Sequence, residues 1–149
     1  ISHFYKWEFL NVFLSLVALV ILSSYLYSFY INHGDYHKMN LFGYIFNYVQ
    51  SGSMEPEIKT YDFVISKAAT FDDVNVGDII TYECNYDQDE DGNIVPRSKP
   101  VIVIHRVIEK GDGYIRTKGD ANEVEDPWQV MPNEIVSKYV CTIPSPVSD

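Results

Sequence analysis

The chain has 149 residues, which is enough for one compact domain and too few for two domains of ordinary size. Its formal charge of −10 at pH 7 argues against a nucleic-acid partner, because phosphate binding needs a basic face and the 11 lysines and arginines are scattered singly. We therefore expect no nucleic acid among its partners.

The first element in chain order is a long apolar run. Residues 9–32 contain no Asp, Glu, Lys or Arg and consist mainly of Leu, Val, Phe and Tyr. A hydrocarbon core of about 30 Å needs roughly 20 helical residues, so this run predicts a transmembrane helix over 9–32 after a flank of 1–8. The alternatives are a buried core helix, which is usually shorter, and a cleaved secretory signal, which would be followed by a small-residue cleavage site.

The orientation of this helix is weakly encoded. Lys6 precedes the run and Lys38 follows it, so positive charge hardly favours either side. Glu8 is the only acidic residue before the run. We therefore expect a single-pass protein with residues 33–149 outside the cytoplasm.

The remaining chain shows short β-rich stretches separated by turn residues. The turn signals include Gly77-Asp78, Gly111-Asp112-Gly113 and Gly119-Asp120. After residue 45 no stretch has a sustained helical period, so we predict a mainly β, antiparallel domain on one N-terminal transmembrane helix. The predicted strands are 44–49, 63–67, 78–82, 101–109, 114–117 and 135–140.

An acidic stretch interrupts this pattern at 85–100. It is the least structured part by sequence and is expected to be a hairpin excursion from the domain. Asp87 to Asp91 also imitate the start of a calcium loop, but Ser98 stands where the bidentate Glu belongs and no helices flank the stretch. An acidic hairpin tip is therefore the preferred interpretation, and we expect no metal and no cofactor.

Three polar sites stand out against the predicted strands. Ser51-Gly52-Ser53-Met54 follows the first strand, His105 interrupts the apolar run that begins at Val101, and Asp120 and Asp126 follow the strand at 114–117. A serine, a histidine and an aspartate are the parts of an acyl-transfer triad. Each is also an ordinary residue of a turn or a satisfied core position, so none is convincing by itself.

Taken in order, these blocks resemble a known family. Ser51–Pro56, then Gly77–Ile80, His105–Val107 and Gly119–Asn122, with Asp126 six residues after Asp120, resemble type I signal peptidases. Histidine where bacterial members carry a catalytic lysine is similar to the archaeal and endoplasmic-reticulum branch of that family. The resemblance covers nearly the whole chain, from the apolar run to about residue 140.

The resemblance implies roles for individual residues. Ser53 corresponds to the nucleophile and His105 to the general base, with Asp126 as the orienting carboxylate and Asp120 in support. Spacing alone leaves the choice between the two aspartates open. Ser51 is placed to be an oxyanion donor, because two residues along an extended segment return to the same side.

The resemblance also implies a substrate and a location. Secretory precursors that carry signal peptides would be cut after small residues, and Met54, Val103 and Ile104 are expected to line the pockets that admit such residues. A membrane location follows, with the cell membrane of an archaeon favoured over the endoplasmic reticulum. The sequence leaves open which precursors are cut and whether partner subunits are needed.

Several alternatives stay open at this stage. The chain could be a membrane-anchored β binding module or an inactive homologue, or a self-cleaving regulatory serine protease of related fold. The last of these normally uses a Ser-Lys pair, which His105 disfavours. Cys84 and Cys141 fit one disulfide or two inert thiols. Some members of the branch carry a second membrane segment after the catalytic domain, so a truncated sequence and a single span are both open.

Overall fold

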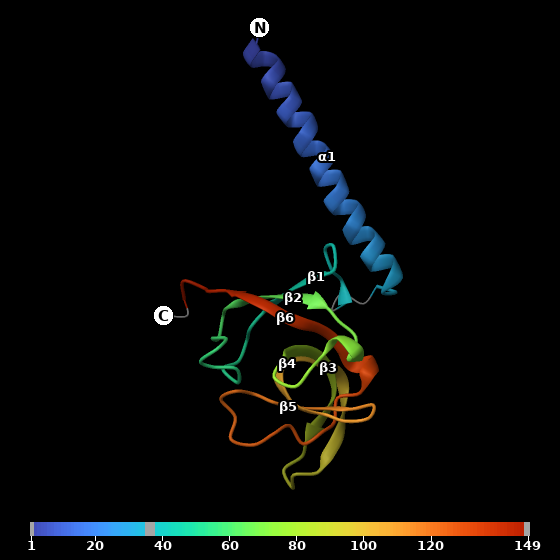
Figure 1. Cartoon of the computed structure of the whole chain (residues 1–149), viewed down its shortest axis with the longest axis vertical. Coiled ribbons are helices and arrows are strands. Elements are labelled where there is room, and N and C mark those ends of the chain that lie inside the picture. The colour runs from blue at the N-terminus through green and yellow to red at the C-terminus, as the bar shows by residue number, and fades with distance from the viewer. Residues whose placement is uncertain (1, 35–37, 148–149) are drawn as a thin grey trace. The chain divides into compact units, whose positions relative to one another are not determined.

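The computed structural model of the protein describes residues 2–34 and 38–147. The chain divides into two compact units, Ile1–Gly43 and Tyr44–Asp149. The first unit contains a long helix and the second contains a β sheet, as Figure 1 shows. The predicted fold class, a mainly antiparallel β domain with one N-terminal apolar helix, is confirmed.

The helix α1 spans Ser2–Ile31. It begins seven residues before the predicted boundary at Phe9, because no Pro or Gly interrupts the intervening residues. Its Tyr5–Ile31 part is long and apolar enough to cross a membrane, and none of its most apolar window is buried. The helix ends where Gly34, at φ +81°, donates its N–H to the carbonyl of Phe29.

The second unit is built on an antiparallel sheet with six strands in its described residues, in the order β1-β2-β6-β3-β4-β5. Two short 3₁₀ helices, η2 (Phe71–Asp73) and η3 (Pro132–Glu134), connect parts of it. The strands are β1 (Tyr44–Tyr48), β2 (Phe63–Ala68), β3 (Ile79–Gln88), β4 (Ile94–Lys110), β5 (Ile115–Lys118) and β6 (Ile135–Ile143).

The acidic stretch at 85–100 is more regular than its sequence indicates. β3 and β4 remain paired out to Gln88 and Ile94, so the stretch is the outer part of one long hairpin. At its tip the Asp89 carboxylate accepts hydrogen bonds from the backbone N–H groups of Asp91 and Asn93. These bonds close the turn and allow the ladder to continue through a polar sequence.

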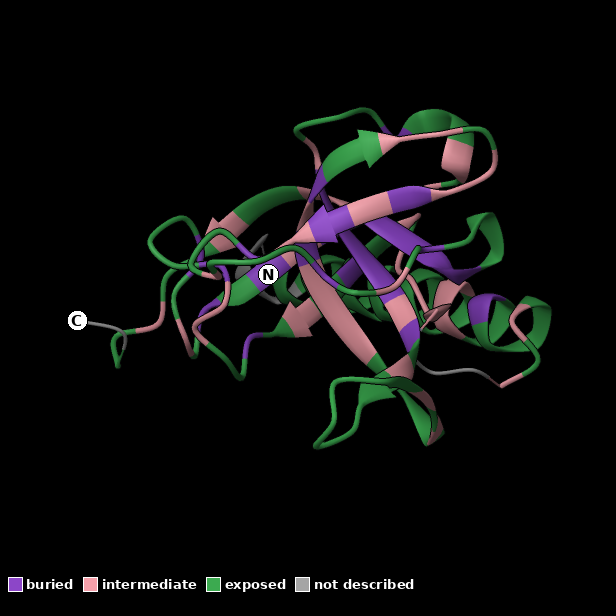
Figure 2. Ribbon diagram, turned by 90° about the horizontal axis from the view of Figure 1, so that it is seen from below, coloured by how far each residue is buried: buried purple, intermediate pink, exposed green. Residues whose placement is uncertain are grey.

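The described residues of the domain form two apolar clusters, one on each side of β3. Ile79 belongs to one cluster and Ile80 to the other, because consecutive strand residues point to opposite faces. Figure 2 shows that the buried positions follow the strands. One cluster comprises Val49, Met54, Ile58, Val64 and Ile79. The other comprises Val74, Ile80, Tyr82, Cys84, Val107, Ile115, Val130 and Ile135.

The two cysteines are free thiols. Cys84 is buried in the second cluster, and Cys141 is exposed on β6. Burial raises the pKa of the Cys84 thiol, so this side chain behaves as a small apolar core residue. The sequence left open whether the two cysteines form one disulfide or remain free, and in the structure they are two free thiols.

Candidate active site

The candidate nucleophile lies in a turn whose neighbouring side chains pack into the core. Ser53 follows β1 and is half-buried, whereas the next residue, Met54, is 2% exposed and packs with Ile58 in the core. The backbone N–H of Ile58 donates to the carbonyl of Met54. A short loop therefore presents the Ser53 hydroxyl from a fixed position, because the neighbouring side chains are held in the apolar interior.

His105, which lies on β4, is the middle residue of the site. Its side chain is almost completely buried, and its two ring nitrogens face two different partners. Nε2 lies 3.1 Å from Ser53 Oγ, and Nδ1 lies 2.6 Å from Asp126 Oδ2. An ionised carboxylate can only accept, so Nδ1 carries the proton opposite Asp126 and Nε2 is left free to accept from Ser53.

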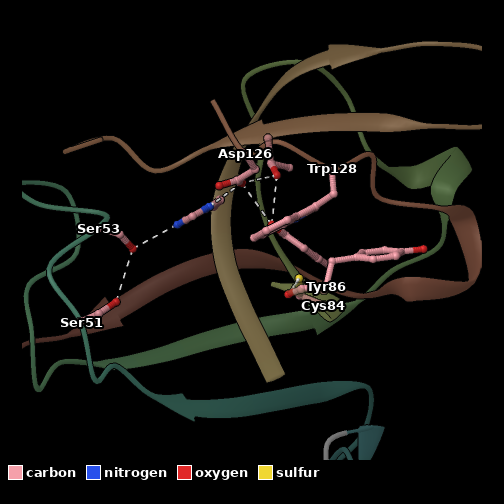
Figure 3. A network of polar contacts seen from close by, with 9 residues as sticks. Ser51, Ser53, Cys84, Tyr86, Asp126 and Trp128 are labelled. Atoms are coloured by element: carbon pink, nitrogen blue, oxygen red, sulfur yellow. Dashed lines mark hydrogen bonds and ion pairs between the residues drawn. The ribbon is translucent and has the colours of Figure 1, made fainter. Parts of the chain in front are cut away.

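Asp126 lies in the loop after β5 and is 6% exposed. Besides His105, its Oδ2 atom accepts from Thr117 Oγ1 at 2.6 Å and from the Tyr82 hydroxyl at 3.1 Å. The Tyr82 oxygen in turn accepts from Trp128 Nε1 at 3.2 Å, and Figure 3 shows this network from Ser51 to Trp128. The carboxylate is thus buried but well supplied with donors.

Burial raises the pKa of Tyr82 far above that of a free phenol, and the nearby Asp126 charge raises it further. The hydroxyl therefore stays protonated at neutral pH. It remains a donor to the carboxylate.

The other predicted site residues have differing surroundings. Ser51 Oγ lies 3.4 Å from Ser53 Oγ and is exposed. Met54 is buried in the core, which leaves it almost no surface to offer to a bound peptide. Val103 and Ile104 are half-buried and point to opposite faces of β4, so Val103 shares the face of His105 and Ile104 packs against the other cluster.

Asp120 has a different partner from Asp126. Its two carboxylate oxygens accept from Arg106 Nε at 2.8 Å and from Nη2 at 2.6 Å, a bidentate pair at the surface. These hydrogen bonds raise the pKa of Arg106, and a third guanidinium nitrogen bonds the Gly77 carbonyl at 2.9 Å. The pair holds the loop after β5 against β4, one residue from His105.

The same loop also contacts the backbone of Ser53. The N–H of Ala121 donates to the Ser53 carbonyl at 2.9 Å. A Cβ atom at Gly119 would lie 2.7 Å from that carbonyl oxygen, so only glycine permits this approach. Sequence reasoning assigned no role to Gly119, Ala121, Thr117 or Tyr82, although the Gly119–Asn122 block had marked the loop itself as unusual.

Gly119→Ala should therefore disturb the candidate nucleophile from outside the triad. The added methyl would meet the backbone carbonyl oxygen of Ser53, which cannot rotate away, and the loop would have to move. Overpacking of this kind costs about 1–3 kcal/mol of stability. We expect a lowered thermal midpoint and a loss of any activity that depends on the Ser53 hydroxyl. Wild-type activity with an unchanged midpoint would show that the loop does not hold Ser53 in place.

Metal ligands do not gather anywhere in the described ranges, 2–34 and 38–147, since no group of three or more His, Cys, Asp or Glu side chains is arranged to hold an ion. At the acidic tip of the hairpin, the Asp89 carboxylate is used within the turn. The Asp89 carboxylate accepts from three nitrogens, the backbone N–H groups of Asp91 and Asn93 and the Asn93 side-chain amide. Its oxygens are engaged in closing the turn.

Comparison with known proteins finds a similarity to a signal peptidase. The chain is similar to signal peptidase I W of Bacillus subtilis (strain 168), with 32% identity over 104 residues, which are 66% of this chain and 48% of that protein. The chain spans about half the length of this curated relative. No family model matches the chain, and no solved structure matches it.

Proposed function

We propose that this chain is a membrane-bound serine endopeptidase of the signal peptidase I type, which removes signal peptides from secretory precursors by cutting after small residues. The observation that carries the proposal is the hydrogen-bonded series Ser53–His105–Asp126. The similarity to the Bacillus signal peptidase supports the substrate class. A histidine opposite the serine, with a buried carboxylate behind it, supports the Ser-His-Asp branch of that family.

In the proposed mechanism Ser53 Oγ attacks the carbonyl carbon of the scissile bond. His105 Nε2, 3.1 Å away, accepts the hydroxyl proton and later gives it to the leaving amine. Asp126 holds the Nδ1 proton and stabilises the imidazolium that forms between these steps. Water, activated by the same imidazole, then hydrolyses the acyl intermediate, which returns Ser53 to its starting state.

The edge of β4 next to His105 offers a place for the substrate backbone. β4 pairs with β5 over Arg106–Lys110, but within the described residues no strand pairs with that edge over Val101–His105. An extended peptide can add to such an edge through backbone hydrogen bonds, which bind without regard to sequence. Of the three residues predicted to line the pockets, this arrangement favours Val103, which lies on the same face of β4 as His105.

The apolar helix explains how the enzyme would meet its substrates. A precursor anchored by its own signal segment and a peptidase anchored by α1 are confined to one membrane surface, which raises their effective concentration. We infer a single-pass topology with the β domain on the side of the membrane opposite the cytoplasm.

The proposal is tested by incubating the purified full chain, in detergent, with a precursor and with the same precursor carrying a bulky residue before the cleavage site. Mass spectrometry of the products should show one cut, after a small residue, in the first substrate only. If no secretory precursor were cleaved under any condition, a binding module would be the better description of the chain.

Ser51→Ala tests the second proposed donor of the oxyanion hole. Its hydroxyl lies 3.4 Å from Ser53 Oγ, close to where the carbonyl oxygen of a bound substrate would develop negative charge. Loss of one such donor costs about 10²–10³-fold in kcat. We expect a fall of that order with little change in KM. Unchanged kinetics would mean that Ser51 serves only the turn.

A further inference from the structure

Three donors converge on a single oxygen of Asp126. His105 Nδ1, Thr117 Oγ1 and the Tyr82 hydroxyl all lie within 2.6–3.1 Å of Oδ2. Trp128 Nε1 can only donate, so the Tyr82 oxygen accepts from it and directs its own proton to Asp126. Thr117 has one proton, and its contact with Asp126 at 2.6 Å is shorter than its contact with Tyr82 at 3.2 Å.

We propose that Thr117 and Tyr82 are positioning residues, which hold the Asp126 carboxylate in place opposite His105 Nδ1 while the peptide bond is cleaved. This inference rests on the proposed function, because positioning matters only if His105 acts as the base. Among the described residues, neither hydroxyl has a hydrogen bond to Ser53. Both act through Asp126.

The surroundings of these two hydroxyls fit this role. Thr117 is fully buried on β5 and holds Asp126 twice, because its carbonyl also accepts the Asp126 backbone N–H at 2.9 Å. Tyr82 is 1% exposed and projects from β3 into the core cluster, so its ring cannot swing away. Two different strands therefore aim donors at one loop carboxylate.

The chemical benefit is a carboxylate that needs no rearrangement during the reaction. A buried carboxylate with His105 as its sole partner could rotate away from Nδ1, and this would remove support from the imidazolium. Donors fixed before the reaction begins stabilise the charged form without reorganisation. Trp128 Nε1 donates to the Tyr82 oxygen at 3.2 Å, and this further contact keeps the Tyr82 hydroxyl in place.

The test compares single variants of the full chain in detergent, on a peptide that spans a cleavage site. Thr117→Val and Tyr82→Phe keep side-chain shape but remove one hydroxyl each. We expect each to lower kcat roughly 10- to 100-fold, the scale of a hydrogen bond to a charged group, with KM nearly unchanged. Thr117→Ser restores the hydroxyl and should recover most of the rate.

A matched control is available on β3. Thr81 is 1% exposed, and its hydroxyl has no hydrogen-bond partner among the described residues. Thr81→Val therefore makes the same chemical change in an equally buried place, and its kcat should stay close to that of the wild type. The low-field proton resonance of the Nδ1–H···Oδ2 bond supplies a second readout, which should persist in Thr117→Ser and be lost or shifted in Thr117→Val.

The inference would be overturned if Thr117→Val and Tyr82→Phe both matched Thr81→Val in kcat and kept the low-field resonance. If Thr117→Val does not fold, Tyr82→Phe decides in the same way. Failure of the proposed function looks different, since the wild type itself would then cleave no precursor. The resonance needs no turnover, so it tests the positioning of Asp126 in that case as well.

Discussion

Ser53→Ala is expected to abolish precursor cleavage in a protein that still folds. The Ser53 hydroxyl is the group placed 3.1 Å from His105 Nε2, and no other atom in the mechanism can form the acyl intermediate. Loss of the nucleophile in a well-studied serine protease lowers kcat by about 2 × 10⁶-fold, which sets the expected scale. Cleavage of a precursor, followed by gel or mass spectrometry, measures the effect.

The fold should survive this change because Met54 and Ile58, not Ser53, anchor the turn in the core. Ser66→Ala is the matched control, since that serine is buried on β2 and its hydroxyl has no partner among the described residues. It should cleave at the wild-type rate. Turnover of Ser53→Ala above a few percent of the control would exclude Ser53 as the nucleophile.

Asp126→Asn is expected to have the second largest effect. The change keeps size and shape but removes the negative charge that faces Nδ1 of His105 at 2.6 Å. The imidazolium formed during the reaction then has no counter-charge, and the amide NH₂ can impose the wrong tautomer on the ring. The corresponding change in the best-studied triad lowers kcat about 10⁴-fold.

Asp120→Asn provides the comparison, because it makes the same change at the other carboxylate of the loop. Asp120 pairs with Arg106 at the surface, where an ion pair contributes about 0–1 kcal/mol, and an amide oxygen retains one of the two hydrogen bonds. We expect a small loss of activity and a slightly lower thermal midpoint. A reversed ranking in kcat would make Asp120 the orienting carboxylate and exclude Asp126 from that role.

The sequence was most informative where local patterns repeat. Each predicted strand overlaps an observed one, because turn residues and short β-rich stretches depend on the neighbouring residues alone. The largest difference concerned the hairpin of β3 and β4. β3 continues to Gln88 and β4 already begins at Ile94, so both are longer than the predicted strands at 78–82 and 101–109. A polar hairpin carries no apolar alternation, so its pairing depends on the register set by the buried part of the same two strands.

The candidate site was less accessible from sequence. The four ordered motifs pointed to Ser53, His105 and an aspartate, but spacing did not choose between Asp120 and Asp126. The two differ only in tertiary surroundings, because one faces Arg106 at the surface and the other faces His105 in the interior. Met54 shows the same limit, since its position beside Ser53 in sequence favoured a substrate pocket while its side chain packs into the core.

The sequence by itself determined the apolar helix, the β character of the domain and the order of the polar motifs, because these follow from composition, period and turn chemistry along the chain. The tertiary structure alone decided which groups meet. His105 and Asp126 are 21 residues apart and His105 and Ser53 are 52 apart, and Tyr82 approaches Asp126 across 44 residues. Contacts at such separations depend on strand order and register in the folded sheet, which no local pattern encodes.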